Sequence, residues 1–331
     1  MMRARIYGTL LVSLFGLLTS FSTRYSITLE NPPRFDSGFF DPGDYSFVIP
    51  SEPLSGTIPF NRIGNLIVIK ATVDSTSGNF ILDTGAPGLI LNLTYFREYT
   101  QDNRRSFTPN GITGELMAGG PTIVKDLSIG VFGYSGVMAD RINLGHLENA
   151  KGIKILGLLG AGLFKRFEMV IDHEKEVIHL YRFGKKEKFG SYHPNLRDHA
   201  KIIIHPIASQ YGKMITEVRI GKNKLSFVLD TGAEINVVDS RLSKQVLSQV
   251  TIERRISLVG AGQSKNEAWY GSLKQLSMGS VQSNNLDVMV TSLKHLSDAY
   301  GRNIDGILGY SFLSGRIAGV NFAANELYLW K

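Results

Sequence analysis

Two tetrapeptides of identical sequence, Asp-Thr-Gly-Ala, are the segments of this chain best suited to chemistry. They begin at Asp83 and at Asp230, 147 positions apart (230 − 83). Two carboxyl groups held about 3 Å apart cannot both ionise easily, so such a pair holds one proton and titrates as a unit. One member can then accept a proton from a water molecule while the other donates a proton to a substrate. We therefore expect Asp83 and Asp230 to meet around a single water molecule.

Each aspartate needs a tight loop that holds its carboxyl group in place. An apolar segment precedes both, Phe80-Ile81-Leu82 in one case and Phe227-Val228-Leu229 in the other. The glycine lets the backbone turn closely and can offer its N–H group to the carboxylate, and the threonine hydroxyls can brace the two loops against each other. A single Asp-Thr-Gly is also a common turn sequence, but two copies in the same context favour a functional role. The residues that we assign to loop support are Thr84, Gly85, Ala86, Thr231, Gly232 and Ala233.

The surroundings of the two tetrapeptides repeat as well. A predicted β-hairpin leads into each of them, over residues 65–86 and 213–233. A second matching pair lies downstream, Leu158-Leu159-Gly160 in the first half and Ile307-Leu308-Gly309 in the second, 149 positions apart (309 − 160). Two matches in nearly the same register indicate an internal duplication.

Both halves are predicted to be all-β, because short β-branched and aromatic runs alternate with turns rich in Gly, Asn and Asp. A further hairpin is expected after each apolar-Gly segment, at residues 169–180 and 318–329. We expect two similar β-barrel lobes related by a pseudo-two-fold axis, with an active-site cleft between them and little helix. The expected division is 1–24 as a signal peptide or N-terminal anchor, 25–190 as the N-terminal lobe with an extra segment at 25–60, and 191–331 as the C-terminal lobe.

Composition limits the possible functions. The chain has 331 residues, no cysteine and a formal net charge of +7. The lack of cysteine excludes disulfides, thiolate nucleophiles and zinc–sulfur sites. Because the basic residues are scattered, a solvated basic surface explains the charge, and no nucleic-acid partner is expected. The seven histidines lack metal-ligand spacing, so we expect neither a metal nor another cofactor.

The first residues have the order of a signal peptide. Arg3 and Arg5 precede an apolar run from Ile6 to Phe21, and polar residues follow. The run is shorter than the roughly 20 residues of a membrane-spanning helix. We expect the mature chain to be secreted or periplasmic, with a membrane contact only if this segment stays on the chain as an uncleaved anchor.

In its motifs the chain resembles the aspartic peptidases of the retropepsin/pepsin clan, and in particular the two-copy, retropepsin-like secreted aspartyl proteases of bacteria. The resemblance rests on Asp-Thr-Gly-Ala followed by an apolar run and on the later apolar-apolar-Gly segment, both present twice, so it covers about residues 65–331. It implies an aspartic endopeptidase that hydrolyses peptide bonds with a water activated by Asp83 and Asp230. It also implies that the apolar-Gly segments thread a ψ-shaped loop beside each aspartate. These ψ-loop residues are Leu158, Leu159, Gly160, Ile307, Leu308 and Gly309.

The resemblance further implies a glycine-tipped hairpin, or flap, that closes over the substrate. A plain turn explains each candidate equally well, but a candidate in both lobes fits the two-flap retropepsin pattern better than the one-flap pepsin pattern. The candidates are Gly111, Ile112 and Gly114 in the first lobe and Gly260, Ala261 and Gly262 in the second.

Two alternatives to a general endopeptidase stay open. The first is a non-catalytic peptide-binding or assembly module that keeps the fold. Both intact tetrapeptides disfavour it, because two facing aspartates carry a desolvation cost that a binding module does not need. The second is a peptidase restricted to one partner or to its own processing. The expected partner in each case is a peptide or protein, and one chain carries both aspartates, so a monomer suffices.

Two alanines bear on the pH dependence. Ala86 and Ala233 occupy the position after Asp-Thr-Gly, where many pepsin-like proteins have a hydroxyl residue. A hydroxyl that donates to the charged carboxylate would lower its pKa. Without that donor, we expect activity to peak at weakly acidic pH, about 5–6.

Overall fold

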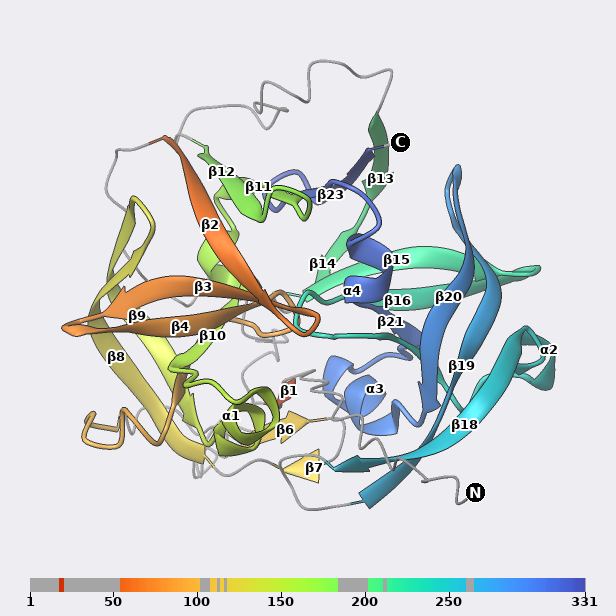
Figure 1. Ribbon diagram of the computed structural model, residues 1–331, viewed down its shortest axis with the longest axis horizontal. Coiled ribbons are helices and arrows are strands. Elements are labelled where there is room, and N and C mark those ends of the chain that lie inside the picture. Colours follow the sequence, from red (N-terminus) through yellow and green to blue (C-terminus); the bar gives the residue numbers. More distant parts are fainter. Residues whose placement is uncertain are drawn as a thin grey trace, which may run out of the picture.

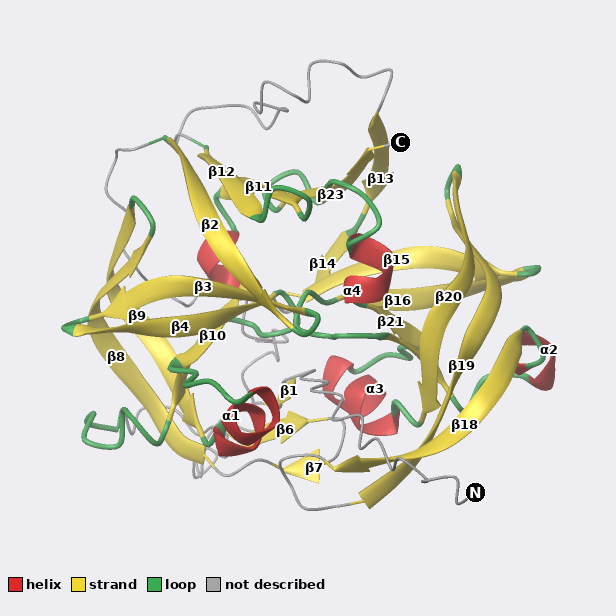
Figure 2. Cartoon of the chain, viewed as in Figure 1, coloured by secondary structure: helices red, strands yellow, loops and turns green. Residues whose placement is uncertain are grey.

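The computed structural model describes residues 18–20, 54–101, 108–111, 114–115, 118–183, 202–210, 213–259 and 265–330. Strands dominate these residues, and helices are short (Figures 1 and 2). The all-β prediction is confirmed. Most of the strands form two closed barrels and a sheet that joins them, and three others form a small separate sheet.

The first barrel is built from six strands. The sheet order returns to its first strand through an additional pairing of β3 with β8, which closes the barrel. In order around the barrel the strands are β3 (Leu66–Val73), β4 (Thr76–Asp83), β10 (Gly157–Gly160), β5 (Leu89–Asn92), β9 (Phe132–Ile142) and β8 (Ala118–Ile129).

The second barrel repeats this arrangement with six strands of its own. A pairing of β15 with β19 closes it, and β14 (Ala208–Gln210) and β18 (Val250–Val259) each add one strand at its margin. Around the barrel the strands are β15 (Lys213–Ile220), β16 (Asn223–Leu229), β21 (Gly306–Leu308), β17 (Asn236–Asp239), β20 (Val281–Thr291) and β19 (Lys265–Met278).

A six-stranded antiparallel sheet joins the two lobes. Its two central strands come from different halves of the chain, and Val170 of one lies opposite Gly319 of the other. The hairpins predicted at 169–180 and 318–329 form the middle of this sheet. Its strands, in order, are β13 (Ile202–Pro206), β23 (Glu326–Trp330), β22 (Ala318–Asn321), β11 (Phe167–Asp172), β12 (Val177–Arg182) and β2 (Ser55–Ile63).

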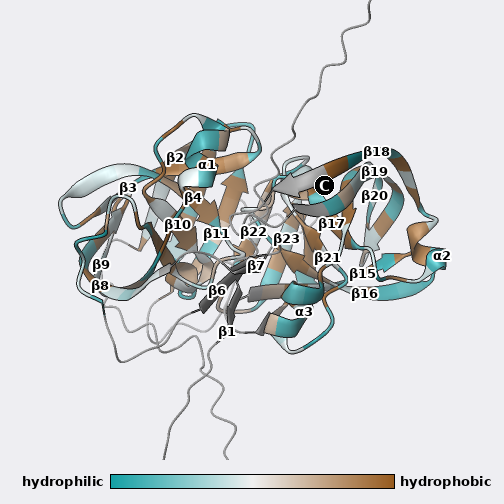
Figure 3. Cartoon of the chain, turned by 90° about the horizontal axis from the view of Figure 1, so that it is seen from below, coloured by the Kyte–Doolittle hydropathy of each residue, from teal (hydrophilic) through white to brown (hydrophobic). Residues whose placement is uncertain are grey.

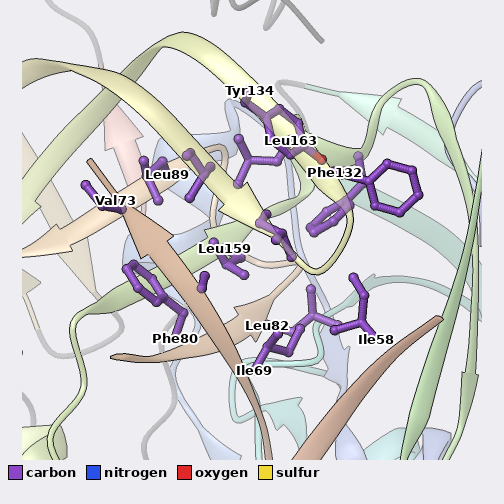
Figure 4. Packing of buried hydrophobic residues seen from close by; sticks show 14 of the residues in the cluster. Ile58, Ile69, Val73, Phe80, Leu82, Leu89, Phe132, Tyr134, Leu159 and Leu163 are labelled. Atoms are coloured by element: carbon purple, nitrogen blue, oxygen red, sulfur yellow. The ribbon is translucent and has the colours of Figure 1, made fainter. Parts of the chain in front are cut away.

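The apolar segments that lead to the aspartates are buried on both faces. Side chains of a strand alternate between its faces, so Phe80 and Leu82 of β4 enter the barrel core (Figure 4), whereas Ile81 joins a second cluster with Leu147. Figure 3 shows hydrophobic residues on the central strands of both lobes. Burial on both faces explains why the sequence is continuously apolar there.

In each lobe a short helix packs on the second hydrophobic cluster, the one outside the barrel core. Helices α1 (Gly145–Lys151) and α3 (Lys294–Tyr300) occupy equivalent positions in the two lobes, each seven residues long and each followed by a left-handed glycine. Two further short segments, η2 (Ala161–Phe164) and α4 (Tyr310–Leu313), directly follow the two apolar-Gly motifs. Helix α2 (Lys244–Leu247) forms one further turn.

Several expectations concern residues outside the described ranges. Of the expected signal peptide at 1–24, only β1 (Leu18–Ser20) is described, and it pairs with β6 (Thr108–Gly111). The expected lobe boundary at 190/191 is not described. Of the extra segment at 25–60, the described part begins at Leu54 and belongs mainly to β2. Among the described residues, no helix is long and apolar enough to cross a membrane.

Candidate active site

The loop that carries Asp83 is threaded by a strand from later in the chain. β10 runs parallel to β4 with Gly160 opposite Asp83, and antiparallel to β5, which leaves the loop. A Cβ atom on Gly160 would lie 2.4 Å from the carbonyl oxygen of Gly88 and 2.6 Å from that of Ala86. Only glycine therefore lets the backbone pass through this loop.

The Asp230 loop is built in the same way. β21 runs parallel to β16 and antiparallel to β17, and the N–H of Asp230 donates to the carbonyl of Leu308 at 3.0 Å. A Cβ on Gly309 would lie 2.3 Å from the carbonyl oxygen of Ala233. The segments that carry the six predicted ψ-loop residues thus run beside the strands that end at the two aspartates.

Backbone N–H groups hold one oxygen of each carboxyl group. Oδ1 of Asp83 accepts from the N–H of Gly85 at 2.9 Å and of Ala86 at 3.0 Å. Oδ1 of Asp230 accepts from the N–H of Gly232 at 2.8 Å. Both aspartates are 1% exposed, so these bonds replace most of the water that a carboxylate would otherwise bind.

Each carboxyl group lies against the glycine of the opposite loop. A Cβ on Gly85 would lie 2.5 Å from Oδ2 of Asp230, and a Cβ on Gly232 would lie 2.6 Å from Cγ of Asp83. Gly85 lies two residues after Asp83, and Gly232 lies two residues after Asp230. Since each glycine contacts the aspartate of the other loop, the two carboxyl groups face each other across the lobe boundary. The structure therefore brings together the two predicted catalytic residues, 147 positions apart in sequence.

The two threonines bond reciprocally across the same boundary. The N–H of Thr84 donates to Oγ1 of Thr231 at 3.1 Å, and the N–H of Thr231 donates to Oγ1 of Thr84 at 3.0 Å. Each hydroxyl in turn donates to a carbonyl of the other lobe, Thr84 to Leu229 at 3.2 Å and Thr231 to Leu82 at 2.8 Å. These four bonds fix the distance between the loops.

Burial and charge shift the protonation of the pair. The pKa of Asp83 is raised well above its ordinary value, first by burial and then by the charge of Asp230, while the N–H groups of Ala86 and Gly85 act in the opposite direction. Oδ2 of Asp83 is buried and has no hydrogen-bond donor among the described residues. A proton shared with Asp230 would supply that missing donor.

A third titratable group near the pair was not found from the sequence. Tyr300, at the end of α3, is 2% exposed and packs in a cluster that includes Ala233. Its pKa is raised well above the ordinary value, first by burial and then by the charges of Asp230 and Asp83. An alignment of the two halves pairs Tyr300 with Lys151, the last residue of α1 (300 − 151 = 149), and this difference in residue type between the lobes was the available signal.

The flap candidates lie at two hairpins. Gly111 ends β6 and pairs with Gly114 of β7 (Gly114–Glu115), while Ile112 lies outside the described residues. In the second lobe β18 pairs with β19 up to Val259 and Lys265. Gly260, Ala261 and Gly262 connect these strands and are themselves outside the described residues. In the part of the chain that the structure describes, no group of three or more His, Asp or Glu side chains could hold a metal ion.

Comparison with known proteins agrees with this geometry. Residues 216–312 match a protein family described as aspartyl protease. The match includes the Asp230 tetrapeptide, β21 and most of α4. No curated protein matches the sequence. The chain is thus similar to the aspartyl proteases over most of its second lobe, and its two six-stranded barrels, meeting at two Asp-Thr-Gly loops, have the fold of a two-lobed aspartic peptidase.

Proposed function

We propose that this protein is an aspartic endopeptidase in which Asp83 and Asp230 form a catalytic dyad. The observation that carries the proposal is the pair of buried carboxyl groups that face each other, with Oδ2 of Asp83 lacking a donor among the described residues. Two carboxyl groups that face each other so closely favour a state in which the pair holds one proton. The match to the aspartyl protease family supports the same reaction class.

The singly protonated dyad can carry out both proton transfers of peptide hydrolysis. The ionised carboxylate takes a proton from the water, whose oxygen attacks the carbonyl carbon of the peptide bond. The proton already on the dyad stabilises the oxygen of the tetrahedral intermediate. A proton then passes from the dyad to the amide nitrogen, the C–N bond breaks, and the amine leaves.

The geometry supports a dyad that works without reorganisation. Both aspartates are held by backbone N–H groups, and the threonine bonds between the loops fix their separation. Preorganised groups of this kind stabilise a transition state more than flexible ones do. Because each lobe of one chain supplies one aspartate, the proposed active unit is a monomer that acts on a peptide or protein without a cofactor. The order of the N-terminal residues further supports a location outside the cytoplasm.

Single substitutions of the dyad test the proposal. Asp83→Asn and Asp230→Asn should each abolish cleavage of a peptide library, measured by mass spectrometry of the products, because an amide cannot accept the proton from water. Asp298→Asn is the matched control, since Asp298 is an exposed carboxylate of α3 that pairs with Lys294. The control should cleave as the wild type does.

Three results would decide against parts of the proposal. Turnover at the wild-type rate in either dyad variant would exclude the shared dyad. A wild-type protein that binds library peptides without cleaving any between pH 3 and 8 would be a binding module. Inhibition by a metal chelator, reversed by zinc, would indicate a different hydrolase. A peptide with a statine-like hydroxyl should inhibit the wild type, because that hydroxyl takes the place of the attacking water.

A further inference from the structure

Three residues join the lobes beside the Asp230 loop. Lys151, at the end of α1, and Asn65, in the turn between β2 and β3, belong to the first lobe, and Glu234 belongs to the second. Nζ of Lys151 donates to Oε1 of Glu234 at 2.5 Å, and the N–H of Asn65 donates to Oε2 at 3.1 Å. Nδ2 of Asn65 also donates to the main-chain carbonyl of Glu234 at 3.0 Å. We call these three residues the interlobe clasp.

The charges of the clasp are largely removed from water. The side chains of Lys151 and Glu234 are 11% and 12% exposed. A buried charge is costly when it stands alone, so removing one partner of such a pair disturbs a protein more than removing a surface pair does. The exposed pair Lys224–Glu217 of the same chain, 59% and 55% exposed, offers the contrast.

Glu234 is the first residue after the Asp230 tetrapeptide. The N–H of Ala233, just before it, bonds to the carbonyl of Asp230 at 3.3 Å, and the carbonyl of Ala233 accepts from the N–H of Tyr310 at 2.8 Å. Nη1 of Arg62, on β2, donates to the hydroxyl of that same tyrosine at 2.8 Å. Figure 1 shows the turn between β2 and β3 approaching α4 at the centre of the molecule. Besides the threonine bonds, the first lobe therefore contacts the region of the Asp230 loop at two places: the interlobe clasp and the bond from Arg62 to Tyr310.

The turn of the clasp leaves no room for a side chain beside Glu234. Gly64, before Asn65, has a φ of +61°, and a Cβ there would lie 2.9 Å from Oε2 of Glu234. A left-handed glycine thus turns the Asn65 N–H toward the carboxylate.

The duplication alone does not explain the clasp. The residue of the first lobe equivalent to Glu234 is Pro87 (234 − 147), and the residue of the second lobe equivalent to Lys151 is Tyr300. Neither can form the ion pair. The Asp230 loop is therefore tied to the opposite lobe by charge, and the Asp83 loop has no such pair at the equivalent positions.

We propose that Lys151 and Glu234 are positioning residues that hold Asp230 in register with Asp83 across the lobe boundary. The inference rests on the proposed function, because the dyad is the group that they position. A small displacement of a catalytic group can lower the rate by about a hundredfold. Since the clasp acts at one end of the loop while the threonine bonds remain, we expect a smaller effect, about tenfold in kcat.

Substitutions of the lysine separate positioning from general stability. Lys151→Met removes the cation that pairs with Glu234 and should lower kcat about tenfold, with KM within twofold of the wild type. Lys151→Arg keeps the charge and should restore kcat to within threefold. Lys224→Met, in the exposed pair, is the matched control and should leave both constants unchanged. All rates are measured at least 15 °C below the unfolding midpoint of each variant, so that only folded protein is compared.

Amide hydrogen exchange supplies a readout that does not depend on activity. The N–H groups of Thr84 and Thr231 each bond to the other lobe, so their exchange reports the contact between the loops. Lys151→Met should speed their exchange about tenfold or more, and Lys224→Met should not change it. If Lys151→Met lowers only the unfolding midpoint and leaves kcat and exchange unchanged, the positioning role is wrong. If the wild type has no activity but the exchange result holds, the proposed function fails while the clasp is retained as a link between the lobes.

Discussion

Replacing Gly85 with alanine probes the contact between the two loops directly. The added Cβ would lie 2.5 Å from Oδ2, 2.6 Å from Cγ and 2.7 Å from Oδ1 of Asp230. Ordinary contacts of a Cβ atom begin at 3.4 Å, so the closest distance is too short by about 0.9 Å. The carboxyl group of Asp230 cannot yield freely, because the N–H of Gly232 holds its other oxygen at 2.8 Å.

The size of the effect follows from that displacement. A shift of about 1 Å in a reacting group costs on the order of a hundredfold in rate, so we expect Gly85→Ala to lower kcat about a hundredfold. Overpacking of a buried contact should also lower the free energy of unfolding by about 1–3 kcal/mol. The assay combines the initial rate on a soluble peptide with chemical denaturation of the same sample.

A second glycine serves as the control. A Cβ on Gly315 would meet nothing within 4 Å, and Gly315 does not have a left-handed φ. Gly315→Ala should therefore keep the wild-type rate and change the free energy of unfolding by no more than about 0.5 kcal/mol. If a folded Gly85→Ala variant keeps kcat within threefold of the wild type, the loops are not in the contact described above and the argument from their geometry fails.

Three further predictions concern the threonines, the aspartate and the alanines of the loops. Thr84→Val should lower the free energy of unfolding by about 1–3 kcal/mol, because it leaves the N–H of Thr231 without its acceptor. Thr84→Ser keeps the hydroxyl and should lower the free energy of unfolding by less. Equal decreases for the two variants in urea titrations would contradict this. Because burial and Asp230 raise the pKa of Asp83 in the folded state, the wild type loses stability as the pH rises above the unfolded value of 3.8. Asp83→Asn should thus be more stable than the wild type at pH 7, and this gain should vanish below about pH 4; a gain that is constant with pH would refute the shift. Ala86→Ser together with Ala233→Ser adds donors to the charged carboxylates and should move both limbs of the rate–pH profile toward acid, so a profile that stays in place or moves toward alkali would show that the alanines do not set the pKa of the dyad.

Local patterns predicted the elements around the dyad well. The hairpins that lead into Asp83 and Asp230 and those of the interlobe sheet could be read from apolar runs and turns, because neighbours in sequence form them. The duplication then indicated two similar lobes. Helices α1 and α3 were missed, because each is seven residues long and too short for a helical period to stand out.

Contacts between distant segments could not be predicted in the same way. β2 pairs with β12 and β13 pairs with β23 within one lobe each, but the paired residues, such as Pro59 with Val177 and Ile202 with Trp330, lie far apart in sequence and no local signal specifies their register. The bond from Lys151 to Glu234 links residues 83 positions apart (234 − 151), and neither residue stands out by type. Charged side chains are usually solvated, so only the structure shows that this pair is largely removed from water.

The threading of the ψ-loops also determines when the site can form during synthesis. The Asp83 loop is complete only when Gly160 is available, 77 positions later (160 − 83), and the Asp230 loop waits for Gly309, 79 positions later (309 − 230). The interlobe sheet then needs β22 and β23, which end at Trp330. Folding that depends on such distant contacts comes late on the ribosome. A nascent chain that lacks these segments therefore cannot bring Asp83 and Asp230 together, so the proposed peptidase would form only after the second lobe has folded.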